Sequence, residues 1–300
     1  MEGFGQKLRY GAEAALFLAF MGLFRLMGLD AASAVGGFIG RAIFARTGVS
    51  RRARENLTAA FPEKSAAQIA AIIATMWDNL GRTVAEYAHL DKLTLWDRIQ
   101  VQGVAYSDAA MANGKGTLLI SGHFANWEVM PIAAAQRGYD GAIVYRPPNN
   151  PYVAAYIARQ RGLRGYREQI SKHQGVRRVF ALLRAAKSVL MLVDQKTNEG
   201  IPVPFFGRDA MTTPVPAGLA LKLGTNIVIV SNRRLKGARF ELTVHPPLLF
   251  TPSGNYDRDV RDLTAAITLK LEEIIRADPG QWLWIHRRWP TGRDIATGKR

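Results

Sequence analysis

Residues 117–121 read TLLIS, a short aliphatic and β-branched run, and three similar runs follow it along the chain. They are GAIVY at 141–145, VLMLV at 189–193 and NIVIV at 226–230. Runs of this length and composition predict buried strands. Helix-patterned segments alternate with them at 125–136, 151–160, 176–186 and 214–223. Such alternation predicts an α/β fold with a largely parallel central sheet flanked by helices on both faces.

The chain before these runs has a helical pattern. Between Arg41 and Leu90, apolar side chains at three- and four-residue spacings form one stripe, namely Ile69, Ile72, Ile73, Met76, Trp77 and Leu80. Another helix is expected near 257–277, before the aromatic segment QWLWIHRRW at 281–289. We therefore expect three parts: a membrane-associating helix over 1–30, a helical region over 31–100 and an α/β domain over 101–300.

An uncharged run, AALFLAFMGLF, occupies residues 14–24. It is shorter than the roughly 20 apolar residues that a helix needs to cross a bilayer. Three interpretations are open: a membrane anchor that extends to Leu29, an ordinary core helix, or a signal peptide. The last is suggested by Lys7 and Arg9 before the run and by the cleavage-like Ala32-Ser33-Ala34 after it. We favour the anchor, and whether it spans the membrane or lies on it stays open.

The charge balance indicates an acidic partner. The 300 residues include 40 Lys and Arg against 24 Asp and Glu, a formal net charge of +16 at pH 7. Nucleic acid, anionic lipid and an acidic protein would each fit this excess. Half of it, 9 − 1 = +8, falls between Arg159 and Lys187, where Glu168 is the one acid. Because the chain has no cysteine and is 48% hydrophobic, disulfide scaffolds, thiol nucleophiles and intrinsic disorder are excluded.

Functional groups of open α/β sheets gather where strands end and helices begin. Directly after the first predicted strand comes SGHFANWE at 121–128, in which His123 precedes Glu128 by five positions. An imidazole that a carboxylate orients can act as a general base, so this pair is the candidate catalytic site. The chain has no G-x-S-x-G motif, so the base would act directly on a substrate hydroxyl. The structural alternative is a capping His123 and a solvated Glu128.

The surroundings of this pair resemble a known family. The segment SGHFANWE is similar to the His-x4-acid motif of glycerolipid-type acyltransferases, and its form resembles that of the lipid A biosynthesis acyltransferases, the late lauroyl and myristoyl transferases. Further blocks resemble that family in the same order over roughly residues 50–290. They are Arg51-Arg52 to Phe61-Pro62, Tyr145-Arg146-Pro147 with Asn150-Pro151, Asp194-Gln195 with PVPFFG at 202–207 and Thr212-Thr213, and QWLWIHRRW.

The resemblance implies transfer of a fatty acyl chain from acyl carrier protein to a hydroxyl of a lipid A precursor, without a cofactor. It implies three partners, which are acyl carrier protein, the lipid A precursor and the anionic inner membrane, and it implies a location at the cytoplasmic face of that membrane. His123, oriented by Glu128, would take the proton of the acceptor hydroxyl. Backbone N–H groups at the helix start after Gly122, or a nearby arginine, would stabilise the oxyanion.

The matching blocks and their neighbours also suggest substrate contacts, for which we select Asn126, Arg146, Arg164, Asp194, Phe205 and Phe206. A guanidinium such as Arg146 can bind phosphate in two-pronged fashion, and Arg164 follows at the expected site entrance. Asp194 can orient an arginine or the acceptor, or simply cap a turn. Phe205 and Phe206 can form an apolar wall for an acyl chain, or a rigid loop packed on the core.

Two other functions stay open. The same motif serves acylation of other glycolipids or of lysophospholipids. A basic nucleic-acid-binding protein would also explain the net charge of +16, but the chain contains no recognisable nucleic-acid module, so we expect no nucleic-acid partner. The five histidines never recur at metal-ligand spacing, so we expect no metal.

Overall fold

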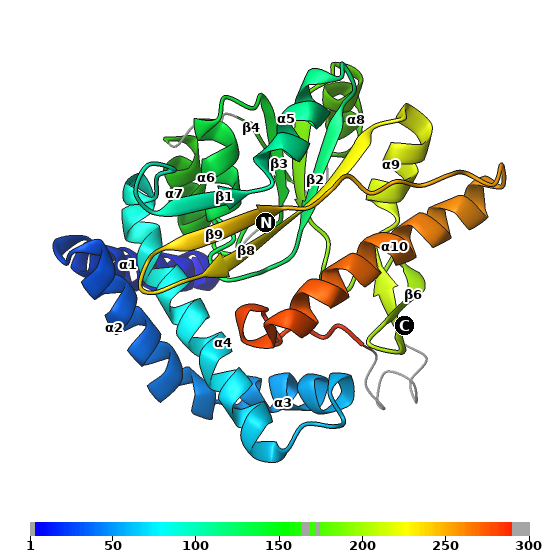
Figure 1. The fold of residues 1–300 in the computed structure, drawn as a ribbon. Coiled ribbons are helices and arrows are strands. Elements are labelled where there is room, and N and C mark those ends of the chain that lie inside the picture. Colours follow the sequence, from blue (N-terminus) through cyan, green and yellow to red (C-terminus); the bar gives the residue numbers. More distant parts are fainter. Residues whose placement is uncertain (1–3, 164–167, 172–174, 290–300) are drawn as a thin grey trace.

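The computed structural model of the chain describes residues 4–163, 168–171 and 175–289. A seven-stranded sheet lies at the centre of this described part (Figure 1), in the order β1-β9-β8-β2-β5-β3-β4. Its strands are β1 (Ile99–Gln102), β2 (Thr117–Ser121), β3 (Gly141–Tyr145), β4 (Glu168–Ser171), β5 (Ser188–Leu192), β8 (Asn226–Arg234) and β9 (Phe240–Val244). Neighbours are parallel except β8 and β9, which run antiparallel. The predicted, largely parallel α/β sheet is confirmed.

Helices cover both faces of the sheet because its central strands are apolar on both sides. In β2, Leu118 and Ile120 belong to one core cluster and Leu119 belongs to the other, and all three are buried. The first cluster includes side chains of α8 (Val176–Arg184), α9 (Val215–Leu223) and α10 (Tyr256–Ala277). The second includes or contacts side chains of α5 (Val104–Ala112), α6 (Val129–Gln136) and α7 (Pro151–Gly162).

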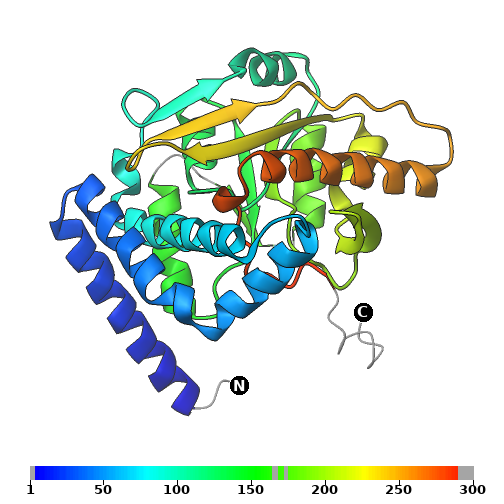
Figure 2. The same cartoon turned by 60° about the horizontal axis from the view of Figure 1, so that its bottom comes forward.

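The N-terminal region is helical, as predicted, and Figure 2 shows its second and third helices beside the fourth, while the first projects away. Its elements are α1 (Phe4–Leu26), α2 (Leu29–Ala42), the 3₁₀ turn η1 (Phe44–Arg46), α3 (Gly48–Ala60), α4 (Ala66–Glu86) and the 3₁₀ turn η2 (Tyr87–Lys92). Helix α4 begins at a capping box formed by Ser65 and Gln68. Its apolar stripe, which includes Ile73 and Met76, lies in the same core cluster as Ile120 of the sheet. The helical region and the sheet therefore share a hydrophobic core.

All four predicted strands are present. Strands β2 and β3 have the predicted bounds, β5 begins one residue earlier, and β8 continues to Arg234. The helix predicted over 125–136 was wrong at its start, because residues 122–128 form the turn that carries His123 and α6 begins only at Val129. The strands that were missed, β1, β4 and β9, alternate or mix polar and apolar residues near the sheet edges, so they lack a continuous apolar run.

The segment expected as a loop around PVPFFG is a β-hairpin. Strands β6 (Ile201–Phe205) and β7 (Arg208–Thr212) pair antiparallel, and the turn residues Phe206 and Gly207 have φ angles of 52° and 69°. Positive φ at both central residues is typical of a tight hairpin turn. The two prolines of β6 are tolerated because this hairpin is a separate two-stranded sheet.

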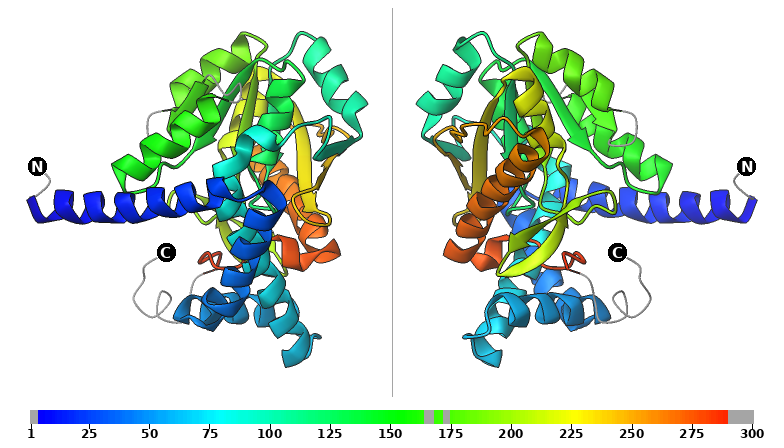
Figure 3. Two further views of the ribbon diagram at one scale, coloured as in Figure 1. Left: turned by 90° about the vertical axis from the view of Figure 1, so that its left-hand side faces the viewer. Right: turned by 90° about the vertical axis from the view of Figure 1, so that its right-hand side faces the viewer.

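Helix α1 extends away from the rest of the molecule, as Figure 3 shows. Tyr10, Ala14, Met21 and Phe24 are buried, whereas large apolar side chains elsewhere on the helix are exposed, namely Leu8, Leu16, Leu18, Phe20, Leu23 and Leu26. In the described part of the chain, no helix is both long enough and apolar enough to cross a membrane.

Helices α2 and α4 approach so closely that only glycine fits between their backbones. A Cβ added to Gly81 of α4 would lie 2.1 Å from the carbonyl oxygen of Gly36 in α2. A Cβ added to Gly40 would lie 2.0 Å from the carbonyl oxygen of Trp77. Because backbone atoms cannot move aside as a flexible side chain can, these contacts fix how α2 lies on α4.

We expect Gly81→Ala to lower the free energy of unfolding by about 1–3 kcal/mol, the usual cost of overpacking. Gly22→Ala in α1 is the matched control, because a Cβ there meets nothing within 4 Å. In a helix interior this replacement should stabilise by about 0.5–1 kcal/mol. Guanidinium unfolding of the three proteins in one detergent measures the difference. Equal stability of the two variants would show that the α2–α4 contact is not tight.

Candidate active site

The site forms where two neighbouring parallel strands end. His123 follows β2, and Asp194 follows β5, which pairs with β2 over its whole length. Parallel neighbours bring their carboxyl ends to the same edge of a sheet, so residues 71 positions apart meet there. The turn after β2 is unusually shaped, since Ala125 has a φ of 43°. Such backbone strain is held by surrounding contacts and is common at functional sites.

Asp194 binds His123 through both of its carboxylate oxygens. Oδ1 lies 2.8 Å from Nδ1 of the imidazole, and Oδ2 accepts the backbone N–H of His123 at 2.7 Å. The indole N–H of Trp282 donates to the same Oδ2 at 2.7 Å. Burial alone would raise the pKa of Asp194, but His123 and these hydrogen bonds hold that pKa well below its usual range. Asp194 is therefore an ionised acceptor.

This contact determines the tautomer of His123. Because Nδ1 faces an ionised carboxylate, Nδ1 carries the proton of the neutral ring and Nε2 has the lone pair. A shallow recess beside the ring is lined mainly by apolar side chains, among them Met76, Leu80, Trp127 and Leu283. Trp127 meets the imidazole edge to face, with ring centroids 5.2 Å apart. The arrangement is that of a general base beside an apolar surface.

The predicted pairing of His123 with Glu128 was wrong, since the carboxylate at the imidazole is Asp194. Glu128 is 2% exposed and accepts from Arg161 of α7 at 2.8 Å and from the Tyr87 hydroxyl at 2.6 Å. Burial would raise the pKa of Glu128, but Arg161 outweighs it and lowers that pKa. Glu128 is thus neither solvated nor the orienting acid. It ties the turn after β2 to α7 and η2.

The predicted role of Asn126 as a substrate contact was also wrong, because its side chain is fully buried and engaged. Its amide donates to Glu86 at 2.8 Å, and its Oδ1 accepts the backbone N–H of Glu128 at 3.0 Å. Glu86 forms a buried ion pair with Arg234 of β8. Asn126 therefore holds the shape of the turn from beneath.

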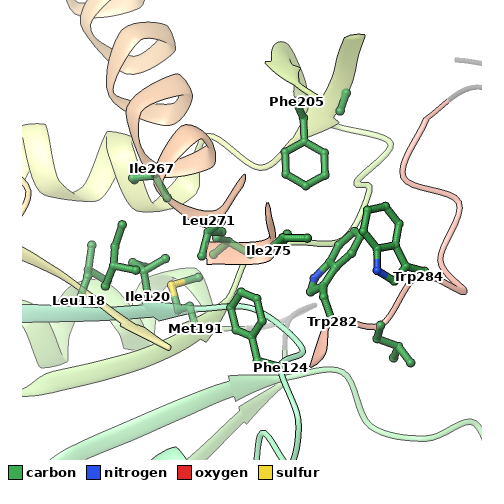
Figure 4. Packing of buried hydrophobic residues seen from close by; sticks show 14 of the residues in the cluster. Leu118, Ile120, Phe124, Met191, Phe205, Ile267, Leu271, Ile275, Trp282 and Trp284 are labelled. Carbon is green, nitrogen blue, oxygen red and sulfur yellow. The ribbon is translucent and has the colours of Figure 1, made fainter. Parts of the chain in front are cut away.

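Phe205 and Phe206 do not form a wall facing open space. They are 1% and 5% exposed and belong to an aromatic cluster, part of which Figure 4 shows. Phe205 packs against Trp282 and Trp289, with ring centroids 5.8 and 5.5 Å apart. The core-packing alternative was right for this pair. Because Trp282 also donates to Asp194, the cluster supports the site indirectly.

The remaining predicted residues have different outcomes. Arg146 is exposed directly after β3, at the same sheet edge as His123, and its phosphate contact stays a prediction. Arg164 lies outside the described residues. Within 4–163, 168–171 and 175–289, no three His, Cys, Asp or Glu side chains gather as a metal-binding group would require.

Three of the backbone N–H groups expected to stabilise an oxyanion, those of residues 123–125, are already in use. The N–H of His123 donates to Asp194, that of Phe124 to the Gly122 carbonyl and that of Ala125 to the Gln281 carbonyl. For these three groups the prediction was wrong, because the turn directs them inward. Gln195 and His286 also contact the site, although neither was predicted as a site residue. Their only signal was their membership of motif blocks that resembled the family.

The structure thus places an imidazole, oriented by a buried carboxylate, at the carboxyl ends of two parallel strands in a largely parallel α/β sheet. Such an imidazole is typical of a general base. The family model described as bacterial lipid A biosynthesis acyltransferase matches residues 1–291. The chain belongs to this family and is an acyltransferase.

Individual relatives are distant. The phosphatidylinositol mannoside acyltransferase of Mycobacterium tuberculosis (strain CDC 1551 / Oshkosh) is 26% identical over 262 residues, which cover 83% of this chain and 80% of that protein. The lipid A biosynthesis lauroyltransferase of Escherichia coli K12 is 26% identical over 257 residues, which cover 81% and 80%. A crystal structure of the acyltransferase PlsC from Thermotoga maritima aligns over 81% of this chain and 98% of that one, with 12% identity and a TM-score of 0.34.

We expect Asp194→Asn to lower kcat by about 10²–10⁴. An asparagine amide can present an N–H to Nδ1, which would move the ring proton to Nε2 and remove the base. The variant should keep its circular dichroism spectrum and elution volume. Turnover within about threefold of the unsubstituted enzyme would contradict the role of Asp194.

Glu128→Gln should act mainly on stability, because it leaves Arg161 buried without a counter-charge, at a cost of about 3–5 kcal/mol. Folding lowers the pKa of Glu128 from its ordinary 4.5. The ionised carboxylate therefore stabilises the fold above about pH 4.5, and this stabilisation is lost as the pH falls below that value. The free energy of unfolding, measured from pH 7 to pH 3, should therefore fall less steeply for this variant than for the unsubstituted enzyme. An unchanged slope would show that the carboxylate is not ion-paired.

Proposed function

We propose that this enzyme transfers a fatty acyl group from the thioester of acyl carrier protein to a hydroxyl of a lipid A precursor, as in secondary acylation during lipopolysaccharide biosynthesis. The observation that carries the reaction is the imidazole of His123, which Asp194 orients and which lines a mainly apolar recess. The family membership and the E. coli relative named as a lauroyltransferase support the acyl donor and the lipid acceptor.

The proposed reaction needs no enzyme nucleophile. Nε2 of His123 takes the proton of the acceptor hydroxyl as the oxygen attacks the thioester carbonyl carbon. A C–O bond forms, and the carbonyl electron pair becomes an oxyanion. When the oxyanion collapses, the C–S bond breaks and the imidazolium returns its proton to the leaving thiolate. Asp194 stabilises the imidazolium and keeps the ring oriented throughout.

The acceptor is the less constrained part of this proposal. The relative from M. tuberculosis is named for a phosphatidylinositol mannoside rather than for lipid A, and it is as similar as the lauroyltransferase, at 26% identity. Another glycolipid is therefore the second candidate acceptor. Both kinds of acceptor carry a phosphate, which exposed cations such as Arg146 can bind.

An in vitro panel tests the reaction. The enzyme is offered acyl carrier protein thioesters of several chain lengths, each with a lipid A precursor, a phosphatidylinositol mannoside or a lysophospholipid, and products are identified by mass spectrometry. We expect one added ester on the lipid A precursor and a loss of about 10²–10⁴ in rate for His123→Ala. Preference for another acceptor would replace the lipid A assignment. Full activity of His123→Ala would contradict the mechanism.

We also propose that α1 lies on the cytoplasmic face of the inner membrane, where a lipid acceptor is available. Its exposed apolar side chains support this location, since Leu16, Leu23 and Leu26 are 62%, 57% and 87% exposed. Exposed apolar surface of this extent is typical of a partner or membrane contact. The net charge of +16 favours anionic lipid.

Sedimentation with vesicles of phosphatidylethanolamine and phosphatidylglycerol tests the membrane contact. We expect the double variant Leu16→Glu/Leu23→Glu to lower the partition coefficient by at least about tenfold, since each buried leucine contributes about 1.5–3 kcal/mol. Leu249→Glu is the matched control, because Leu249 is 92% exposed and lies between β9 and α10, away from α1. Equal loss for both, or no loss for either, would place the membrane contact elsewhere.

A further inference from the structure

Gln195 lies between two imidazole rings at the mouth of the site. Its amide nitrogen is 3.1 Å from Nε2 of His123 and 2.9 Å from Nε2 of His286. The centroids of the two rings are 5.7 Å apart. Gln195 directly follows Asp194, the residue that orients His123. The same amide nitrogen is 3.5 Å from Nδ1 of His123, so it lies over the face of that ring and leaves the in-plane approach to Nε2 open to an acceptor hydroxyl.

The two rings determine which way the amide points. Nε2 of His123 has a lone pair, because the proton of that ring is on Nδ1 facing Asp194. Burial, and then the nearby His123, lower the pKa of His286 to about 4, so this ring is neutral at physiological pH. The Gln195 nitrogen approaches both rings as an NH₂ group, which can donate one N–H to Nε2 of His286 while the other lies over the face of the His123 ring. The amide therefore directs its two N–H groups into the site.

The position of His286 is itself held by the chain. Asn56 of α3 donates to the backbone carbonyl oxygens of Trp284 and His286, at 2.8 Å each. Trp284 is fully buried in the aromatic cluster. The imidazole of His286 is thus a fixed acceptor for one N–H of Gln195. The other N–H lies beside the His123 ring, where an oxygen of the bound substrate can accept it.

We propose that Gln195 is a further catalytic residue, whose amide N–H donates to the oxyanion of the tetrahedral intermediate, and that His286 is a positioning residue that holds this amide. The proposal rests on the acyl-transfer reaction proposed above. The backbone N–H groups of residues 123–125, in the turn after β2, are engaged elsewhere. Gln195 supplies the oxyanion donor in their place.

The geometry suits each stage of the reaction. The acceptor oxygen reaches Nε2 of His123 in the plane of the ring, beside the amide and not in its place, and the carbonyl carbon that it attacks lies one bond further on. The developing oxyanion is two bonds from the acceptor oxygen, within hydrogen-bond reach of an amide displaced only slightly from its present position. On collapse the negative charge passes to the thiolate, which His123 protonates, and the amide keeps its hydrogen bond to His286. A donor that strengthens its bond only as charge develops lowers the barrier.

Steady-state kinetics of Gln195→Ala and Gln195→Glu, measured with the acyl carrier protein thioester, test the role of the amide. We expect kcat to fall by about 10²–10³, the usual cost of one oxyanion donor, with KM values changed by less than about threefold. Gln195→Glu should be no better than Gln195→Ala, because a carboxylate repels the oxyanion. Gln100→Ala, at an exposed position on the edge strand β1, is the matched control and should keep full activity.

Replacing the carbonyl oxygen of the donor by sulfur separates catalysis from a structural role. A thioanion accepts hydrogen bonds poorly. The drop in kcat on changing from the thioester to the dithioester should therefore be larger for the unsubstituted enzyme than for Gln195→Ala. His286→Ala should lower kcat on the thioester by about tenfold and reduce this sulfur effect, because the Gln195 amide then loses the ring that holds it. A Gln195→Ala enzyme within threefold of full kcat, or with an undiminished sulfur effect, would overturn the proposal. If the unsubstituted enzyme fails with every thioester, the acyl-transfer reaction itself is wrong.

Discussion

The buried carboxylate of Asp194 is the group around which the site is organised. An ionised carboxylate that is only 4% exposed is stable only if its oxygens accept strong hydrogen bonds. The donors come from two distant parts of the chain: the backbone and ring of His123 after β2, and the indole of Trp282 near the C-terminal end of the described residues. Burial and function are therefore linked, because the bonds that compensate the charge also set the tautomer of the base.

A second layer of buried charge holds the turn that presents His123. Glu128 pairs with Arg161 of α7, and Glu86 of α4 pairs with Arg234 of β8 while it accepts from Asn126. Removing one partner from such a pair costs more than an exposed ion pair contributes, since a charge is left buried. The acid of the His-x4-acid motif thus acts on the shape of the turn. Substituting Glu128 would therefore impair the enzyme by disturbing the turn and not by removing the base.

The fold was largely predictable because the central strands are buried on both faces and appear as continuous apolar runs. His123 was found because it follows such a strand, at the edge where α/β sites lie. Its partner Asp194 was not found, because sequence spacing suggested Glu128. Asp194 follows β5, and β5 lies beside β2 even though β3 is the next strand along the chain. Asp194 and Gln195 were noticed without their roles, and His286, 91 residues after Gln195, has no local pattern that indicates its contact. Phe205 and Phe206 were misassigned because burial in an aromatic cluster and lining of an apolar cavity require the same residue types.

The tautomer of His123 is the most direct test of this organisation. Nitrogen-15 spectra of histidine-labelled enzyme, with resonances assigned by single substitutions, report which ring nitrogen carries the proton. At neutral pH we expect the proton of His123 on Nδ1 in the unsubstituted enzyme and in Glu128→Gln, and a change of tautomer in Asp194→Asn. A proton on Nε2 in the unsubstituted enzyme, or a tautomer that changes with Glu128 and not with Asp194, would contradict the assignment of Asp194 as the orienting acid.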